Sequence, residues 1–296
     1  MKQVISTLIF SLTTLFAMES NAQDLRKLSA GPFTFDVYNA SQNSFGVASV
    51  IIYGQKDAVL IDAQFTLADA EKVATEIKNS GKRLTTIYVS HGDPDFYFGL
   101  QAFKTYFPDV TVYASPATVD HIKTTAQKKL EVWGKNLGKA ITSNVILPQV
   151  LQGSSLELEG QKLEIVGLGE FPTNTFVWIP SAKAVVGGIN VFGNTFHLWM
   201  ADAQSHEAHA AWIAVLDKIA ALQPEIVVPA HGTSAADFTV QSVKYTKDYI
   251  LFYEEALKEH KTSESLIKAL KAKYPNAGFE TALQLSAKVN TGEMKW

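Results

Sequence analysis

Three side chains that commonly bind metals or transfer protons lie close together at His91, Asp93 and Asp95. They directly follow an apolar run at residues 84–89. An imidazole and two carboxylates are costly to bury unless a cation or hydrogen-bond partners compensate them. Their alternating spacing predicts one shared site at the carboxyl end of a strand, where open α/β sheets place ligands. The alternative is a polar turn with an N-capping carboxylate.

Two further polar residues follow predicted strands. Residues 58–61 form an apolar strand that ends at Asp62, and residues 226–228 form another that is soon followed by His231. The hypothesis of one shared site requires the His231 imidazole to converge with His91 and the paired aspartates.

The remaining pattern predicts the architecture. A helix is expected over residues 96–106, whereas residues 128–139, with two glycines, are expected to form a long loop or a broken helix. Strands and helices are followed by short strands between residues 145 and 186, then by a helix and a final strand. This order predicts an α/β (α+β) chain with two helix-covered sheets, a four-layer αββα sandwich.

Other candidates surround the predicted site. His197 is either a substrate or metal contact or a hydrogen-bonded loop histidine, and Asp202 is a polar candidate near the site. Tyr97 and Trp199 either line an apolar substrate pocket or pack in the core.

Composition limits the chemistry. The chain has 296 residues and a net charge of -3, and its lysines and arginines form no run, which disfavours nucleic-acid binding. It has no cysteine, so any metal must be held by His, Asp or Glu. No serine-hydrolase or phosphate-loop motif is present.

Residues 1–22 predict a signal peptide. Lys2 precedes a largely apolar stretch, and small residues follow at Ser20 and Ala22. An uncleaved anchor is the alternative. The expected mature protein is a single domain at residues 23–296 with a helical C-terminal extension, periplasmic or secreted and without stable membrane insertion.

The segment from His91 to Phe96 resembles the His-x-His-x-Asp-His motif of the metallo-β-lactamase superfamily. Asp62 is similar to the aspartate of the family's first motif, and His231-Gly232 resembles its last ligand motif. The resemblance implies the four-layer fold and a metal-dependent hydrolase. It also implies that Asp62 does not bind the metal itself but fixes the loop and orients a ligand histidine.

The sequence departs from the family at four ligand positions. Asp93 and Phe96 stand where the family has histidines, Glu170 corresponds to the mid-chain histidine, and no carboxylate lies near residues 188–189. The remaining set favours one divalent ion, zinc, iron or manganese, held by His91, Asp93, Asp95, His231 and, less clearly, Glu170.

The leading hypothesis is therefore an exported hydrolase of a small ester, lactone, thioester or amide. Asp95 would orient a metal-bound water and accept its proton. Two alternatives are an iron-based redox or oxygen-binding protein and a non-catalytic ligand-binding relative with a degenerate metal site.

Overall fold

The computed structural model describes residues 25–296, so the predicted signal peptide at residues 1–22 lies outside the described part. Its larger sheet has seven strands in sequential order. The pairs from β1 to β4 are antiparallel and those from β4 to β7 are parallel. The strands are β1 (Arg26–Ala30), β2 (Phe33–Asn39), β3 (Ala48–Tyr53), β4 (Asp57–Ile61), β5 (Arg83–Val89), β6 (Thr111–Ala114) and β7 (Gln149–Val150).

The second sheet has five strands in the order β12-β11-β10-β9-β8. Its pairs are antiparallel except for β11 and β12, which run parallel. These strands are β8 (Ser155–Leu158), β9 (Gln161–Val166), β10 (Phe176–Ile179), β11 (Ala184–Val186) and β12 (Ile226–Val227).

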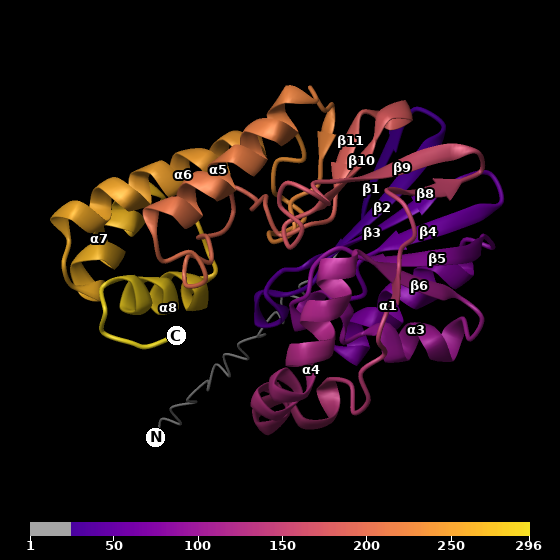
Figure 1. Cartoon of the computed structure of the whole chain (residues 1–296), viewed down its shortest axis with the longest axis horizontal. Coiled ribbons are helices and arrows are strands. Elements are labelled where there is room, and N and C mark those ends of the chain that lie inside the picture. Colours follow the sequence, from indigo (N-terminus) through magenta and orange to yellow (C-terminus); the bar gives the residue numbers. More distant parts are fainter. Residues whose placement is uncertain (1–24) are drawn as a thin grey trace, which may run out of the picture.

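Helices cover the outer faces of both sheets (Figure 1). On the seven-stranded sheet lie α1 (Leu67–Asn79), α2 (Pro94–Tyr97), α3 (Leu100–Tyr106) and α4 (Pro116–Leu137). On the five-stranded sheet lie α5 (His206–Ala221) and α6 (Val240–Glu259), followed by α7 (Ser263–Lys273) and α8 (Glu280–Asn290). Single 3-10 turns occur at Gln42–Ser44, Gly138–Ala140 and Pro180–Ala182.

Three apolar clusters hold the layers together. One packs Ile87 of β5 against Ile122 of α4, and a second fills the space between the sheets. The third packs Val185 of β11 against Leu216 of α5 and continues through the C-terminal helices. The predicted four-layer αββα sandwich is confirmed, because burial of both faces of both sheets requires four layers.

The structure corrects two predicted elements. The helix expected over residues 96–106 is divided into α2 and α3 at Gly99, where a side chain would meet the Ala63 carbonyl oxygen at 1.9 Å. Residues 128–137, expected as a loop or broken helix, are the second half of the continuous helix α4. The start of α4 is stabilised by the Ser115 side chain, which accepts a hydrogen bond from the Thr118 amide, and by Pro116 in the first turn.

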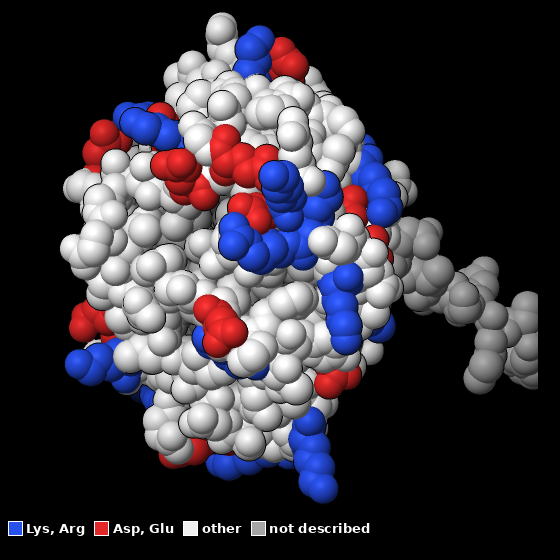
Figure 2. Space-filling view, turned by 90° about the vertical axis from the view of Figure 1, so that its right-hand side faces the viewer, with Lys and Arg blue, Asp and Glu red and all other residues white. Residues whose placement is uncertain are grey.

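Charges of both signs are mixed on the surface. On the face shown in Figure 2, groups of basic side chains lie directly beside acidic ones. Within residues 25–296, no helix is long and apolar enough to cross a membrane.

Candidate functional site

A buried carboxylate fixes the loop that carries the predicted site. Asp62 follows β4 and accepts hydrogen bonds from the Ser90 amide (2.7 Å) and the Ser90 hydroxyl (2.6 Å). The Ser90 hydroxyl in turn accepts a bond from the Gly188 amide (2.7 Å), which follows β11. Burial raises the pKa of Asp62 to about 7, although both Ser90 bonds lower it. This network joins the two sheets immediately before His91.

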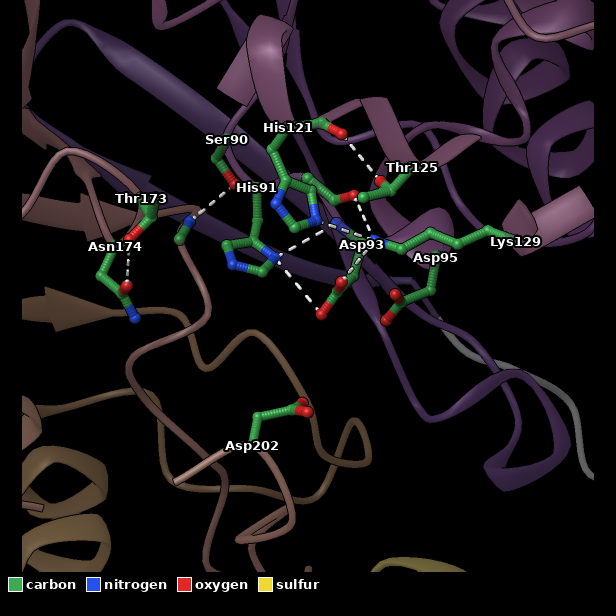
Figure 3. A network of polar contacts seen from close by, with 12 residues as sticks. Ser90, His91, Asp93, Asp95, His121, Thr125, Lys129, Thr173, Asn174 and Asp202 are labelled. Atoms are coloured by element: carbon green, nitrogen blue, oxygen red, sulfur yellow. Dashed lines mark hydrogen bonds and ion pairs between the residues drawn. The ribbon is translucent and has the colours of Figure 1, made fainter. Parts of the chain in front are cut away.

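His91 and Asp93, which lie side by side in Figure 3, form the more accessible part of the site, with side chains 14% and 31% exposed. The Asp93 amide donates to His91 Nδ1 at 3.3 Å, and Asp93 Oδ2 lies 3.5 Å from the same nitrogen. Burial lowers the pKa of His91, so its imidazole is neutral at neutral pH. With the Nδ1 lone pair taken by an amide, the ring proton is on Nε2.

Lys129 of α4 completes this part of the site. Its ammonium lies 2.9 Å from Asp93 Oδ1, 2.9 Å from the Gly92 carbonyl oxygen and 3.0 Å from His121 Nε2. Burial raises the pKa of Asp93, but His91 and Lys129 outweigh it and hold that pKa below its usual range. Asp93 is therefore ionised and balanced by a charge from the chain itself.

Asp95 and His231 form a deeper pair. His231 Nε2 lies 3.7 Å from Asp95 Oδ2, beyond a direct hydrogen bond, and each side chain is only 7% exposed. His231 Nδ1 donates to the Phe45 carbonyl oxygen at 3.1 Å, which leaves Nε2 as an acceptor. Burial raises the pKa of Asp95 well above its usual range, and the nearby charge of Asp93 raises it further. Burial also lowers the pKa of His231 to about 4.

A family comparison bears on this geometry. The Metallo-beta-lactamase superfamily matches residues 43–231, which include every residue of the network described so far. The chain belongs to this superfamily.

Two curated relatives have low sequence identity to this chain. A linear primary-alkylsulfatase from Pseudomonas sp. (strain ATCC 19151) is 20% identical over 79% of this chain and 52% of its own length. A type 2 metallo-beta-lactamase from Pseudomonas aeruginosa is 27% identical over 55% of this chain and 61% of its own length. The chain thus spans between half and two thirds of the length of these relatives.

Solved structures confirm the fold. A metallo-beta-lactamase from Pontibacter korlensis is 20% identical with a TM-score of 0.55, covering 77% of this chain and 98% of its own. The crystal structure of VMB-1 is 19% identical with a TM-score of 0.57, covering 78% of this chain and 97% of its own.

The superfamily generally binds zinc, which several donor side chains must surround. Among residues 25–296, no group of three or more His, Cys, Asp or Glu side chains is placed to hold a metal ion. The predicted ligands come together as two pairs, and the Phe96 ring contacts both imidazoles, with centroids 5.2 Å from His91 and 5.7 Å from His231. Asp93 already forms an ion pair with the Lys129 ammonium group. As arranged here, these residues do not fit a divalent ion.

Glu170 does not join the site. Its side chain is 64% exposed and accepts two bonds from Lys218 of α5, each of 3.2 Å. The order of residues along the chain places Glu170 at the family's histidine position, but a surface ion pair with α5 directs the carboxylate away. Its expected role as a ligand is not supported.

The other predicted residues lie at different depths. His197 is buried among the C-terminal helices, where Nδ1 hydrogen-bonds with the Tyr249 hydroxyl at 3.0 Å, which agrees with the simpler alternative of a hydrogen-bonded histidine. Asp202 is exposed and accepts a bond from Trp296 Nε1, and Figure 3 shows it standing apart from His91 and Asp93. Its charge raises the pKa of His91, so the two groups interact.

The two predicted aromatic residues, Tyr97 and Trp199, also differ in how deeply they are buried. Tyr97 is 1% exposed, and within the described residues its hydroxyl has no hydrogen-bond partner. Burial raises the pKa of Tyr97, and the charges of Asp93 and Asp95 raise it further, so the ring lies near both carboxylates. Trp199 packs against Phe45 and Trp296, with centroids 6.1 and 5.8 Å apart, at the boundary between the sandwich and the C-terminal helices.

Sequence reasoning missed Lys129 and His121. Both lie on α4, eight positions apart and therefore on nearly the same face of the helix. Gly92 lets that face approach, since a side chain at Gly92 would meet His121 Cδ2 at 2.5 Å. Helical spacing of His121, Thr125 and Lys129 was the available signal, but Lys129 lies in the stretch from residue 128 that was expected to be a loop or a broken helix.

A cavity lies at the carboxyl ends of β6 and β7, and none of the site residues described above lines it. Ser115 follows β6 as Ser90 follows β5, and Val89 pairs with Ala114 in the parallel ladder. The cavity measures about 360 Å³ and is lined mostly by small and apolar residues: Ser115, Pro116, Leu151, Leu168 and Pro172 among them. Its size suits part of a small molecule.

Proposed function

We propose that the protein is a hydrolase that cleaves an ester, lactone, thioester or amide of a small molecule. The observation that carries the proposal is the juxtaposition of Asp95 with the acceptor nitrogen of His231, close to a second imidazole of fixed tautomer at His91. Membership of a superfamily of hydrolases and the cavity at the carboxyl ends of β6 and β7 support it.

In this proposal Asp95 is the general base. A water molecule bonded to both Asp95 Oδ2 and His231 Nε2 would be held by two groups that are 3.7 Å apart. The Asp95 carboxylate takes a proton from that water while the water oxygen attacks the substrate carbonyl carbon. Because Asp95 is desolvated, its ionised form is a stronger base than an exposed aspartate.

His91 would serve the opposite side of the reaction. Its Nε2–H can donate to the carbonyl oxygen as negative charge develops there, since Nδ1 is engaged by the Asp93 amide. The intermediate collapses when the bond to the leaving group breaks, and Asp95 returns its proton to that group. Asp93 and Lys129 keep the His91 loop in place.

The metal-dependent version of this mechanism, with zinc, iron or manganese, was the expectation from the motif. The donor geometry does not support it, so no step is assigned to an ion. The hydrolysis assay decides the point if each substrate is tested after chelator treatment and again with each divalent ion added.

The test is turnover of a panel of esters, lactones, thioesters and amides by purified protein. We expect activity that D95N lowers by a factor of about 100 or more, as for loss of a general base. The matched control is D120N, because Asp120 is an exposed aspartate on α4. Activity should rise with pH as Asp95 loses its proton. Retention of full activity in D95N would refute the role of Asp95.

A non-catalytic ligand-binding protein is the second candidate. It is favoured by Asp93, whose charge is already balanced by Lys129 and needs no added ion. Such a protein would bind members of the same panel without turnover, and its affinity would not depend on Asp95 ionisation. The iron-based alternative needs three or more His, Cys, Asp or Glu side chains around one point, and residues 25–296 place no such group.

We further propose that the protein is exported to the periplasm or beyond the cell. The support is the sequence pattern of residues 1–22. N-terminal sequencing of the natively expressed protein checks this, and a chain that retains Met1 would contradict cleavage.

A further inference from the structure

Lys129 is more fully engaged than a surface lysine normally is. An ammonium group has three N–H donors, and Lys129 directs them to three different acceptors, Asp93, Gly92 and His121. Its side chain is 21% exposed although it lies on the outer helix α4. Figure 3 shows the side chain reaching across from α4 to the loop after β5.

The acceptors around Lys129 form a built cation site. One is a carboxylate, one is a main-chain carbonyl oxygen and one is an imidazole nitrogen, all at 2.9 or 3.0 Å. Lysine cannot accept a hydrogen bond, so His121 Nε2 must be unprotonated. The contact depends on Gly92, because any larger residue there would displace the His121 ring.

The same carboxylate would be needed by a metal ion. Asp93 Oδ1 is bonded to Lys129, and Asp93 Oδ2 faces His91 Nδ1. A divalent ion placed between Asp93 and His91 would lie only a few ångströms from the ammonium group and be repelled by it. Lys129 therefore competes with any dication for this end of the site.

We propose that Lys129 is the permanent cation of this site and excludes a divalent metal from His91 and Asp93. The ammonium group of Lys129 then supplies to Asp93 the positive charge that a metal ion would otherwise supply. This inference does not depend on hydrolysis, because it concerns which cation Asp93 holds.

The experiment is titration of the purified, chelator-treated protein with Zn²⁺ and Mn²⁺. Calorimetry measures the binding, and the midpoint temperature of thermal unfolding is recorded with and without each ion. We expect weak or no one-to-one binding to the wild type. K129M, which keeps the length of the side chain without its charge, should bind one ion at least about ten-fold more tightly. K129R should behave like the wild type because it keeps the charge.

Two controls locate the effect. K128M removes a neighbouring exposed lysine of α4 and should leave metal affinity unchanged. D93N in the K129M background should abolish the gain, whereas a gain that survives shows binding elsewhere, such as at His206 and His209, and overturns the proposal. It is also overturned if the wild type binds an ion as tightly as K129M, or if neither binds. A folded K129M is verified by its unfolding transition without metal.

Discussion

Replacement of Ser90 by alanine is expected to destabilise the protein more than its small size suggests. The Ser90 hydroxyl donates to Asp62 at 2.6 Å and accepts from the Gly188 amide at 2.7 Å, and both Ser90 and Asp62 are almost fully buried. S90A leaves one buried acceptor and one buried donor unsatisfied. Each costs roughly 1–3 kcal/mol, so the free energy of unfolding should fall by about 3–4 kcal/mol.

The loss should also depend on pH. The folded-state pKa of Asp62 is about 7, raised above its unfolded value by burial. A raised carboxyl contributes stability that is fully present below the unfolded pKa and is lost as pH rises through the folded pKa. S90A removes a bond that lowers this pKa and so raises it further. The difference between S90A and wild type should therefore be larger at about pH 8 than at about pH 5.

Urea unfolding followed by tryptophan fluorescence at both pH values measures these differences. The matched control is S143A, which alters an exposed serine and should change stability by less than about 0.5 kcal/mol. A loss below about 1 kcal/mol in S90A, or an equal loss at both pH values, would refute the view that Ser90 carries the link between the sheets.

Three more predictions concern single positions. Burial lowers the pKa of His197 to about 4, so the wild type should lose stability as pH falls from about 6.5 toward 4, and H197Q should show a flatter acid limb in pH-dependent unfolding. Y97F should change the free energy of unfolding by less than about 0.5 kcal/mol, because no described residue bonds the Tyr97 hydroxyl, whereas a raised KM in the active panel would reveal a substrate contact. G99A should cost about 2 kcal/mol or more in urea unfolding, since its side chain would meet the Ala63 carbonyl oxygen; a neutral result would contradict the close approach of α3 to that loop.

The sequence predicts the position of the site better than its contents. Apolar runs that end in Asp62 and His91 mark neighbouring parallel strands, and the register of β4 with β5 places their carboxyl ends together. His231 joins them through bridges to Val47 and Phe192. Strand order accounts for Asp62 and His91, whereas His231 follows β12 of the other sheet, and its convergence was predicted from the resemblance to the family.

Side-chain direction could not be predicted in the same way. Glu170 has the sequence position of a ligand, but its carboxylate pairs with Lys218 on a helix whose location depends on the whole fold. Lys129 was missed for the converse reason. Its contribution depends on the face that α4 presents to Gly92, and two glycines near residue 135 made a continuous helix difficult to recognise.

The cost of burying a negative charge is compensated differently at Asp93 and at Asp95. This difference explains how the two carboxylates can lie close together without an ion between them. Asp93 keeps its charge because Lys129 lies 2.9 Å away. Asp95 has no cation at that distance in the described chain, and burial raises its pKa, so its carboxylate accepts a proton more readily than that of an exposed aspartate. Neutral His91 and His231 then add no charge that must be compensated. The Phe96 ring contacts both imidazoles, so an apolar side chain lies next to His91 and His231 where the family has a metal-binding histidine. Proton transfer by Asp95 is consequently the chemistry that this arrangement supports best.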